Sequence, residues 1–531
     1  MATQQITENT PPSPTRPTMY GASPSSSRSS TSTLPTMADF DERTPLVKRK
    51  GSMVMEDLLD RLNLNAGPAS YKTEIIWLFK SSVPIIATYL LQNSLQMASV
   101  LSLGHLGATE LAASALASMF ACVTAWSFAY GITTALDTLC SNAWTGASDK
   151  TLVGVHLQRA LLFLSLLFFP IAAVWWNAEW VLLMLGQEAA LAHHAGLFLR
   201  YLLLGAPAYM AFEALKRYLQ AQGIMHAATY VLFIASPFNM LTNYLFVWWA
   251  PLSLGYIGAP LATAMTYWIM LGLILLYIKY VAGSEAWGGW SRQCLTQWGM
   301  FVKLAIPGTL MICSEWWAFE LVALAASYLG TMSLAAQSII LTTSGATYCV
   351  PFGTSLAVST RVGNLLGAQL PEHARIASNV GILFAIVFGL FNSIILLVFK
   401  DVWGYLFTSD PAVVVLVAAI LPLCALFQVA DGLAGIGGGV LRGMGRQTIG
   451  AALNLVAYYG CALPLGTWLT FQMDWGLKGL WTGLFVALFV IGAGETVFIC
   501  TTDWDKEIKR CMDRVRCDGD FSDSDTVTDV V

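Results

Sequence analysis

Three acidic residues lie inside long apolar stretches of the sequence. Glu315 and Glu320 stand near the middle of one stretch, and Asp431 interrupts another just before a glycine-rich run. A carboxylate inside a bilayer-spanning helix is energetically costly, so it is a functional candidate by default. Burial favours its neutral form, which lets it exchange a proton near physiological pH. If a proton and an organic cation compete for one carboxylate, linkage lets one gradient drive the other, so these residues predict antiport.

A second interpretation of these acids is that they form hydrogen bonds across helices and only fix packing. Glu320 lies five residues beyond Glu315, about 140° around a helix, so the two cannot both point straight at one ligand. The predicted set for proton coupling and cation binding is Glu315, Asp431 and Glu320, with a packing role for Glu320 left open.

Aromatic and amide side chains in the same region could line a substrate cavity. Trp316, Trp317 and Tyr348 offer ring faces to a cation or a planar compound, although lipid-facing aromatic residues have the same pattern. Gln337 and Asn454 are uncharged polar residues within helices, where hydrogen bonds between helices are the alternative role. The predicted substrate cavity consists of Trp316, Trp317, Gln337, Tyr348, Asn454 and Tyr458.

Other charged residues of the apolar region have simpler explanations. Asp137 and Glu213 stand next to helix ends, where we expect solvation or salt bridges to Lys216 and Arg217. Arg200 is the only basic residue that we expect well inside a helix of the core. A flippase for a lipid-linked precursor needs several basic groups for its phosphate, so that function is disfavoured.

Motifs of enzymes and cofactor-binding proteins are missing from the sequence. It contains no G-x-x-x-x-G-K-[ST], H-E-x-x-H or G-x-S-x-G element, and the glycine-rich run after Asp431 lacks the order of a nucleotide loop. Its ten cysteines form no C-x-x-C pair, and its net charge of −4 argues against nucleic acid. We therefore expect no enzyme, metal or cofactor, and an ion gradient or a partner as the energy source.

The elements that position these residues are membrane-spanning helices. The chain is 56% hydrophobic and 11% charged, with a mean hydropathy of +0.61. Between about residues 78 and 500 it is a succession of apolar stretches of about 20 residues, the length that crosses a bilayer. We count twelve, centred near residues 92, 122, 166, 203, 236, 267, 316, 346, 387, 425, 457 and 488.

The two halves of the apolar region repeat each other. Pro84 corresponds to Pro307 at an offset of 223, and Asn142 corresponds to Asn364 at an offset of 222. A repeat of six helices returns the chain to its starting side, so the copies are parallel and related by a pseudo-two-fold axis along the membrane normal. This predicts an all-α membrane protein with a tail (1–70), two six-helix lobes (71–285 and 286–500) and a second tail (501–531).

The distribution of charge predicts the orientation. Nearly all of the 28 Lys and Arg residues fall on one side of the predicted bundle, together with both termini, which places both termini in the cytoplasm. The Ser/Thr/Pro-rich segment 1–50 predicts a disordered tail, followed by a short pre-membrane helix. Residues 41–47 resemble an acidic dileucine sorting signal, so a vacuolar or a plasma membrane is expected, with the protein as a monomer.

Several motifs together resemble the multidrug and toxin extrusion (MATE) family in its eukaryotic branch, and the tail is similar to that of fungal members. They include Gly104-His105-Leu106-Gly107, Glu315-Trp316-Trp317, Arg361-Val362-Gly363-Asn364 and Gly439-Val440-Leu441-Arg442-Gly443. The resemblance implies twelve helices in two lobes and proton-driven export. It also implies that the glutamate of E-W-W, Glu315, is the coupling carboxylate and that Asp431 is a second acid.

The sequence departs from this family in ways that bear on its substrate and coupling ion. Animal members often have a further glutamate where this chain has Thr342, and the first helix lacks the aspartate of the prokaryotic branch. Coupling is therefore expected in the C-terminal lobe. The predicted cargo is a small organic cation or drug-like compound, exchanged for protons, with sodium coupling or export of an organic anion or secondary metabolite as alternatives.

Overall fold

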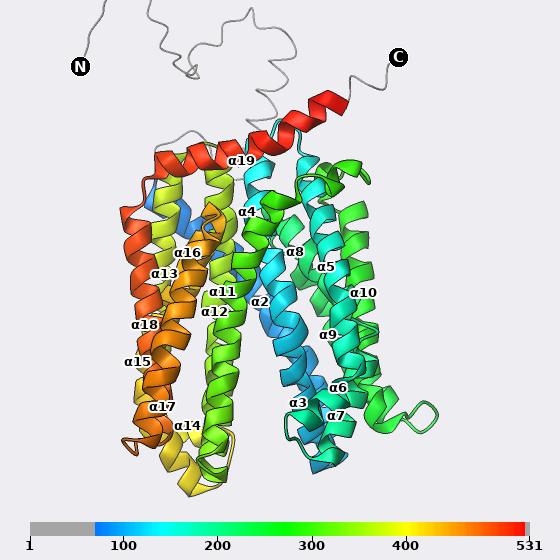
Figure 1. Cartoon of the computed structure of the whole chain (residues 1–531), viewed down its shortest axis with the longest axis vertical. Coiled ribbons are helices and arrows are strands. Elements are labelled where there is room, and N and C mark those ends of the chain that lie inside the picture. Colours follow the sequence, from blue (N-terminus) through cyan, green and yellow to red (C-terminus); the bar gives the residue numbers. More distant parts are fainter. Residues whose placement is uncertain (1–68, 526–531) are drawn as a thin grey trace, which may run out of the picture. The chain divides into compact units, whose positions relative to one another are not determined.

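The computed structural model describes residues 69–525, and within this range the chain forms helices and no strand. The predicted disordered tail, its sorting signal and the pre-membrane helix lie outside the described residues. Most described residues are assigned to helices that run roughly parallel to one another (Figure 1). The all-helical class predicted from the sequence is confirmed.

The first six spans form the N-terminal lobe. Two of them are interrupted: α3 continues through a π-helical turn at Cys122–Trp126 into α4, and α7 is bent by 57° relative to α8. A π-turn inserts an extra residue into the helix and is often found at functional sites. The helices of this lobe are α2 (Tyr71–Gly104), α3 (Ala108–Ala121), α4 (Ser127–Gly146), α5 (Leu152–Trp176), the short α6 (Ala178–Met184), α7 (Ala189–Leu202), α8 (Ala206–Ala221), α9 (Ala227–Val247) and α10 (Gly258–Tyr280).

The next six spans form the C-terminal lobe. Its fifth span is also interrupted, because α16 passes through a π-helical segment at Val456–Ala462 into α17. The helices of this lobe are α11 (Trp298–Ser327), α12 (Thr331–Gly367), α13 (Pro371–Val398), the short α14 (Lys400–Trp403), α15 (Pro411–Met444), α16 (Gln447–Leu455), α17 (Leu463–Phe471) and α18 (Leu477–Thr501).

The twelve predicted spans are all present as helices, although they do not all have a strong hydropathy signal. Within the described range ten helices are long and apolar enough to cross a membrane, and the bent pair α7 and α8 makes an eleventh. The twelfth is α12, which has 37 residues and packs along α15, α2 and α4. Many Ser and Thr residues lower its hydropathy, and its inward position allows them to form hydrogen bonds within the bundle.

The two lobes meet mainly where α4 packs against α11 and α12. Small residues make this approach close: a Cβ atom added to Gly363 would lie 2.8 Å from Cβ of Ser141, and one added to Gly367 would lie 2.6 Å from the carbonyl oxygen of Asn142. The hydroxyl of Thr145 donates to the carbonyl oxygen of Asn364 across this contact, at 2.7 Å. The lobes are therefore in backbone-to-backbone contact near the C-terminal ends of α4 and α12.

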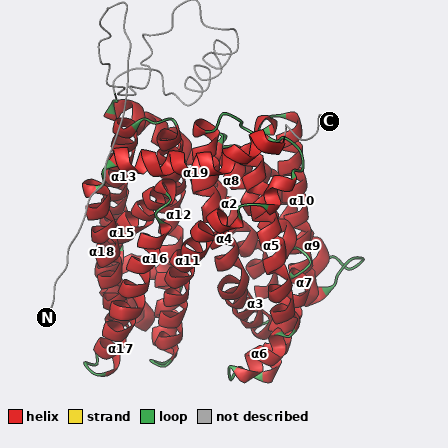
Figure 2. Cartoon of the chain, turned by 45° about the horizontal axis from the view of Figure 1, so that its top comes forward, coloured by secondary structure: helices red, strands yellow, loops and turns green. Residues whose placement is uncertain are grey.

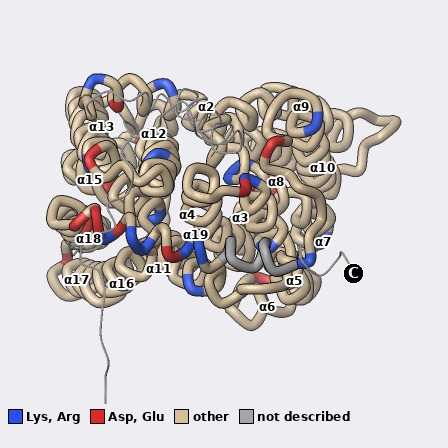
Figure 3. Tube along the Cα trace, turned by 90° about the horizontal axis from the view of Figure 1, so that it is seen from above, with Lys and Arg blue, Asp and Glu red and all other residues tan. Residues whose placement is uncertain are grey.

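A final helix, α19 (Trp504–Asp525), crosses the end of the bundle where α2 begins (Figures 1 and 2), and we call this end the α19 face. Helix α19 contacts α4 of the N-terminal lobe and α12 and α13 of the C-terminal lobe. Arg514 donates to the carbonyl oxygen of Met444 at 2.9 Å, and Arg446 pairs with Glu507 at 2.8 Å. Seen from this face, α19 lies beside α4 and α11 (Figure 3). It thus bridges the two lobes.

Candidate functional site

A small cavity inside the C-terminal lobe collects most of the predicted site residues. Its volume is about 10 Å³, which is room for roughly one water molecule. Helices α11, α12, α15, α16 and α18 and the π-helical segment of the fifth span form its walls. Among its lining residues the polar and charged ones are Glu315, Tyr348, Asp431, Arg442, Asn454 and Tyr458.

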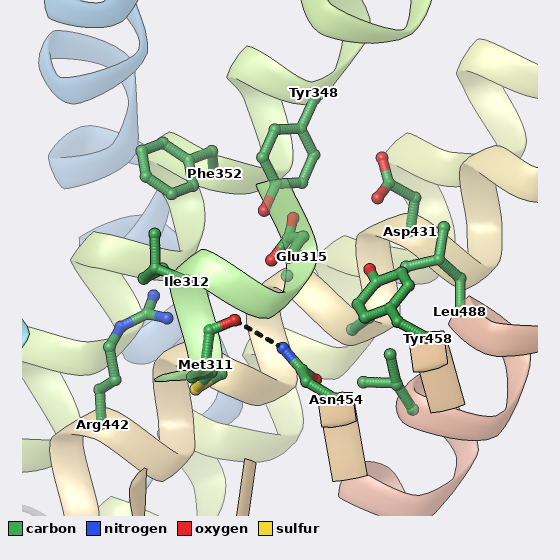
Figure 4. A pocket seen from close by; sticks show the side chains of 13 residues that line it. Met311, Ile312, Glu315, Tyr348, Phe352, Asp431, Arg442, Asn454, Tyr458 and Leu488 are labelled. Carbon is green, nitrogen blue, oxygen red and sulfur yellow. Dashed lines mark hydrogen bonds between the residues drawn. The ribbon is translucent and has the colours of Figure 1, made fainter. Parts of the chain in front are cut away.

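Two of the three predicted carboxylates lie on different helices but share this cavity. Glu315 comes from α11, and Asp431, which is 5% exposed, comes from α15. The hydroxyl of Tyr348 points toward Glu315, and the hydroxyl of Tyr458 is directed toward the side of the cavity where Glu315 and Asp431 lie (Figure 4). Asn454 donates to the carbonyl oxygen of Met311 at 3.0 Å, which fixes its amide at the edge of the cavity. The site can therefore present two carboxylates and two phenol hydroxyls to one bound group.

Other predicted site residues do not line this cavity. Trp317 donates to the carbonyl oxygen of Val123 at 3.1 Å, and Trp316 contacts Tyr130 with 5.6 Å between ring centroids, so both lie at the contact between the lobes. Gln337 is 1% exposed and accepts a hydrogen bond from Trp481 at 2.7 Å, a contact between two helices of one lobe. Glu320 also lies outside the cavity lining, and its role stays a prediction.

The sequence analysis missed a fourth carboxylate, Glu495 in α18. Its side chain is 0% exposed, and neither carboxylate oxygen has a side-chain hydrogen-bond partner in the described part of the chain. It packs on the glycines of α15, because a Cβ atom added to Gly437 would lie 3.0 Å from Cβ of Glu495. The sequence signal was an acid six residues before the end of α18, within the last apolar stretch.

The prediction that Arg200 is the only basic residue well inside the helical core is wrong. Arg200 is partly exposed and pairs with Glu179 at 3.6 Å, whereas Lys216, Arg217, Arg361 and Arg442 are buried. Each of these four side chains has a carboxylate partner. Removing a charge from water is costly, and such a partner offsets part of that cost. Hydropathy alone could not show these pairs, because most of the partners are distant in the sequence.

Two of these arginines share one aspartate at the lobe contact. Asp137 of α4 lies 3.2 Å from Nη1 of Arg217 and 3.5 Å from Nε of Arg442. Arg217 belongs to the same lobe as Asp137, and Arg442 belongs to the other lobe. Salt bridging of Asp137 is therefore confirmed, but its expected solvation is wrong, because its side chain is 4% exposed.

The N-terminal lobe has an ion pair where the C-terminal lobe has its carboxylate cavity. The offset of 223 places Gln92 at the position that Glu315 has in the second repeat. Gln92 donates to Glu213 at 2.9 Å and accepts from Lys216 at 3.0 Å. The Lys216 ammonium lies 2.8 Å from Glu213 and 4.7 Å from the ring centroid of Tyr89. This lobe thus surrounds its own ammonium group with a carboxylate, an amide and an aromatic face.

The described residues contain no group of three or more His, Cys, Asp or Glu side chains arranged to hold a metal ion. The C-terminal cavity instead combines two acids and two tyrosine hydroxyls with one arginine, and the excess of one acid suits a proton or a single positive charge.

Comparisons with known proteins bear on the repeat and on the fold. The MatE family model matches the chain twice, at residues 84–245 and 307–468, so the internal repeat at an offset of 223 is confirmed. The chain is 43% identical to an uncharacterized transporter of Schizosaccharomyces pombe, over 87% of this chain and 88% of that protein. It is 36% identical to multidrug and toxin extrusion protein 2 of Mus musculus, over 81% of this chain and 75% of that protein.

A solved structure has the same arrangement of helices. The crystal structure of the eukaryotic MATE transporter AtDTX14 superimposes with a TM-score of 0.79 at 30% sequence identity. The match covers 84% of this chain and 99% of that structure, so it includes both lobes.

Proposed function

Because the chain belongs to the multidrug and toxin extrusion (MATE) family of membrane transporters, which are not enzymes, we propose that it exports small organic cations or drug-like compounds in exchange for protons. The family resemblance found in the sequence is confirmed. The observation that carries the proposal is that Glu315 and Asp431, from two different helices, line one small enclosed cavity.

The physical basis of the exchange is the cost of burying these two carboxylates. Two negative charges close together in a low-dielectric interior repel each other, and each loses its hydration. A proton relieves that cost in the cavity as it stands, and an organic cation relieves it once the cavity, which holds about one water molecule, has widened. The two compete because they neutralise the same groups. Protons that enter from the acidic side therefore expel the cation, and the empty, doubly charged site resists closure. Both effects favour coupled exchange over leakage of either ion.

We further propose that the α19 face is cytoplasmic and that the protein works as a monomer in a vacuolar or plasma membrane. The excess of Lys and Arg on the side that holds both termini supports this orientation. In this orientation the lobes are in contact on the cytoplasmic side, as they would be after cargo has been carried outward.

The buried basic residues do not favour a lipid-linked precursor as cargo. Lys216 and Arg361 each have a carboxylate of their own, and Arg217 and Arg442 share Asp137, so most of this positive charge is already compensated. A phosphate headgroup would have to displace those partners.

The experiment that tests the proposal is flux of ethidium or tetraethylammonium in proteoliposomes with an imposed pH gradient. We expect Glu315→Gln to abolish gradient-driven flux and Asp431→Asn to reduce it strongly. Asp401→Asn, which changes an exposed carboxylate of the same lobe, is the matched control and should retain flux. Flux that follows a sodium gradient instead would replace the proton by sodium, and unchanged flux in both cavity variants would refute the site.

A further inference from the structure

We infer that Arg442 is a positioning residue that makes the proton affinity of the C-terminal cavity depend on whether the lobes touch at the α19 face. The inference rests on the proposed proton coupling. Among the described residues, Arg442 forms no ion pair within 4 Å with Glu315 or Asp431, so it acts on these acids through its charge. Arg442 is 4% exposed, so its charge acts in a low-dielectric environment, where charge–charge interactions are strong.

On one side Arg442 faces the acids of its own lobe. It lines the same cavity as Glu315 and approaches from the side opposite Asp431 (Figure 4). Its Nη1 atom and Oε1 of Glu495 lie 3.6 Å and 3.7 Å from the position that a Cβ atom on Gly438 would occupy. The guanidinium and the Glu495 carboxylate therefore both approach Gly438, and Cε of Met311 occupies the space that a side chain on this glycine would take.

On its other side Arg442 faces the N-terminal lobe. Its Nε atom lies 3.5 Å from Asp137, and its Nη2 atom donates to the hydroxyl of Ser355 at 2.6 Å. Its backbone is also part of the lobe contact, because Thr138 donates to its carbonyl oxygen at 2.5 Å. Gln447 in turn donates to the hydroxyl of Thr138 at 2.8 Å. Arg442 is therefore held at the place where the two lobes meet.

Separation of the lobes changes the charge balance around Arg442. While the lobes touch, Asp137 compensates part of the Arg442 charge. If they separate at the α19 face, Asp137 leaves with Arg217, its partner within the N-terminal lobe, and the uncompensated Arg442 remains near the cavity acids. A positive charge favours the ionised form of a nearby carboxyl group. The acids therefore bind protons more tightly while this face is closed and release them when it opens.

This difference in proton affinity between the closed and the open α19 face sets the direction in which protons move during export. Protons load while the cavity is shut off from the α19 face, and they leave on the side of that face once it opens. By linkage, protonation stabilises the arrangement in which Arg442 is paired with Asp137. The charged and titratable groups that surround Arg442 in this scheme are Glu315, Asp431, Glu495, Tyr348, Tyr458, Asp137, Arg217 and, at neighbouring Met444, Arg514.

The test is the pH dependence of ethidium binding to the purified full-length protein in nanodiscs. The inflection in log Kd plotted against pH reports the proton affinity of the acids, separately from the intrinsic affinity for ethidium. We expect Arg442→Gln to move the inflection about one pH unit higher and Asp137→Asn to move it lower. Arg442→Lys keeps the charge and should restore an inflection close to that of the wild type.

Two further measurements separate this role from a structural one. In the Arg442→Gln background, Asp137→Asn should produce no additional shift, because Asp137 acts through Arg442. Arg446→Gln and Glu507→Gln, which break an ion pair four residues further along the chain, are matched controls and should leave the inflection in place. Equal shifts in both backgrounds, or shifts of the same sign in the two single variants, would overturn the inference. A wild type without any inflection would overturn the proposed function instead.

Discussion

Glu74 of α2 and Arg361 of α12 form a two-point ion pair between the lobes, with Oε1 2.6 Å from Nη2 and Oε2 2.8 Å from Nε. Both side chains are almost fully buried, and the guanidinium also lies 4.5 Å from the ring centroid of Trp77. Such an ion pair adds little to the free energy of unfolding compared with an apolar pair. Removing one partner lowers that free energy strongly, because the other charge then stays buried without a partner.

We therefore expect Glu74→Gln to lower the free energy of unfolding by about 3 kcal/mol. The double variant Glu74→Gln with Arg361→Met should recover part of this loss, because no unpaired charge remains. Thermal unfolding in a fixed detergent, followed for wild type, single and double variants, measures both effects. A double variant less stable than Glu74→Gln would show that the cost does not come from an unpaired charge.

The close contact between Gly363 and Ser141 predicts a conformational effect rather than a loss of folding. In Gly363→Ala the added methyl group must push α4 away from α12, because it would lie 2.8 Å from Cβ of Ser141. We expect the lobes to separate more readily at the α19 face and Cys140, which is buried in α4, to react faster with a maleimide. Gly345→Ala, at a position of α12 where the added atom meets no neighbour, is the control. Equal labelling rates in all three proteins would contradict the prediction.

Glu495 predicts a pH-dependent change in stability. A buried carboxylate without a side-chain hydrogen-bond partner costs folding energy when it is ionised, whereas glutamine has nearly the same shape and no charge. We expect Glu495→Gln to melt at a higher temperature than the wild type at pH 8 and the difference to shrink as the pH falls, because the wild-type acid then becomes neutral as well. Melting curves between pH 5 and pH 8 test this. A difference that grows on acidification would show that the charged form is the stabilising one.

The buried ion pair of Lys216 and Glu213 predicts that a small amine restores thermal stability to a variant that lacks the lysine. In Lys216→Ala the Glu213 carboxylate is left buried without the ammonium group that lies 2.8 Å from it, and the ring of Tyr89 loses the same cation. We expect a loss of thermal stability that millimolar methylammonium partly restores, because that ion resembles the missing end of the lysine side chain. The same amine should have no effect on the wild type or on Lys279→Ala, which lacks an exposed lysine of the same lobe. Restoration by sodium chloride at equal concentration would assign the effect to ionic strength instead.

The spans of the fold could be predicted because each is a local property of the sequence. Each of the twelve apolar stretches corresponds to a helix, including α12, whose hydropathy is low but whose place in the repeat is clear. The π-helical turns at 122–126 and 456–462 could not be predicted, because they depend on how a helix adjusts to its neighbours.

The candidate site was predictable only in part. Glu315 and Asp431 stand out as acids in apolar surroundings, and the structure places both at one cavity. Arg442 and Glu495 were missed because each lies toward the end of an apolar stretch, where a charge is unremarkable. Their meeting across Gly438 depends on the packing of α15 against α18, which hydropathy does not reveal.

The ammonium group of Lys216 has a consequence for the symmetry of the molecule. A cation attached to the chain is present at an effective concentration of about millimolar or higher, and it cannot diffuse away. In the first repeat the Lys216 ammonium therefore occupies the Glu213 carboxylate permanently, and a cation from solution would have to displace it. The second repeat has Glu315 and Asp431 at its cavity with Arg442 as the one attached cation among the lining residues, and Arg442 also pairs with Asp137, so the acids outnumber the positive charge available to them. Duplication has produced one half that is saturated by its own sequence and one half whose charge balance is open to exchange with the solution.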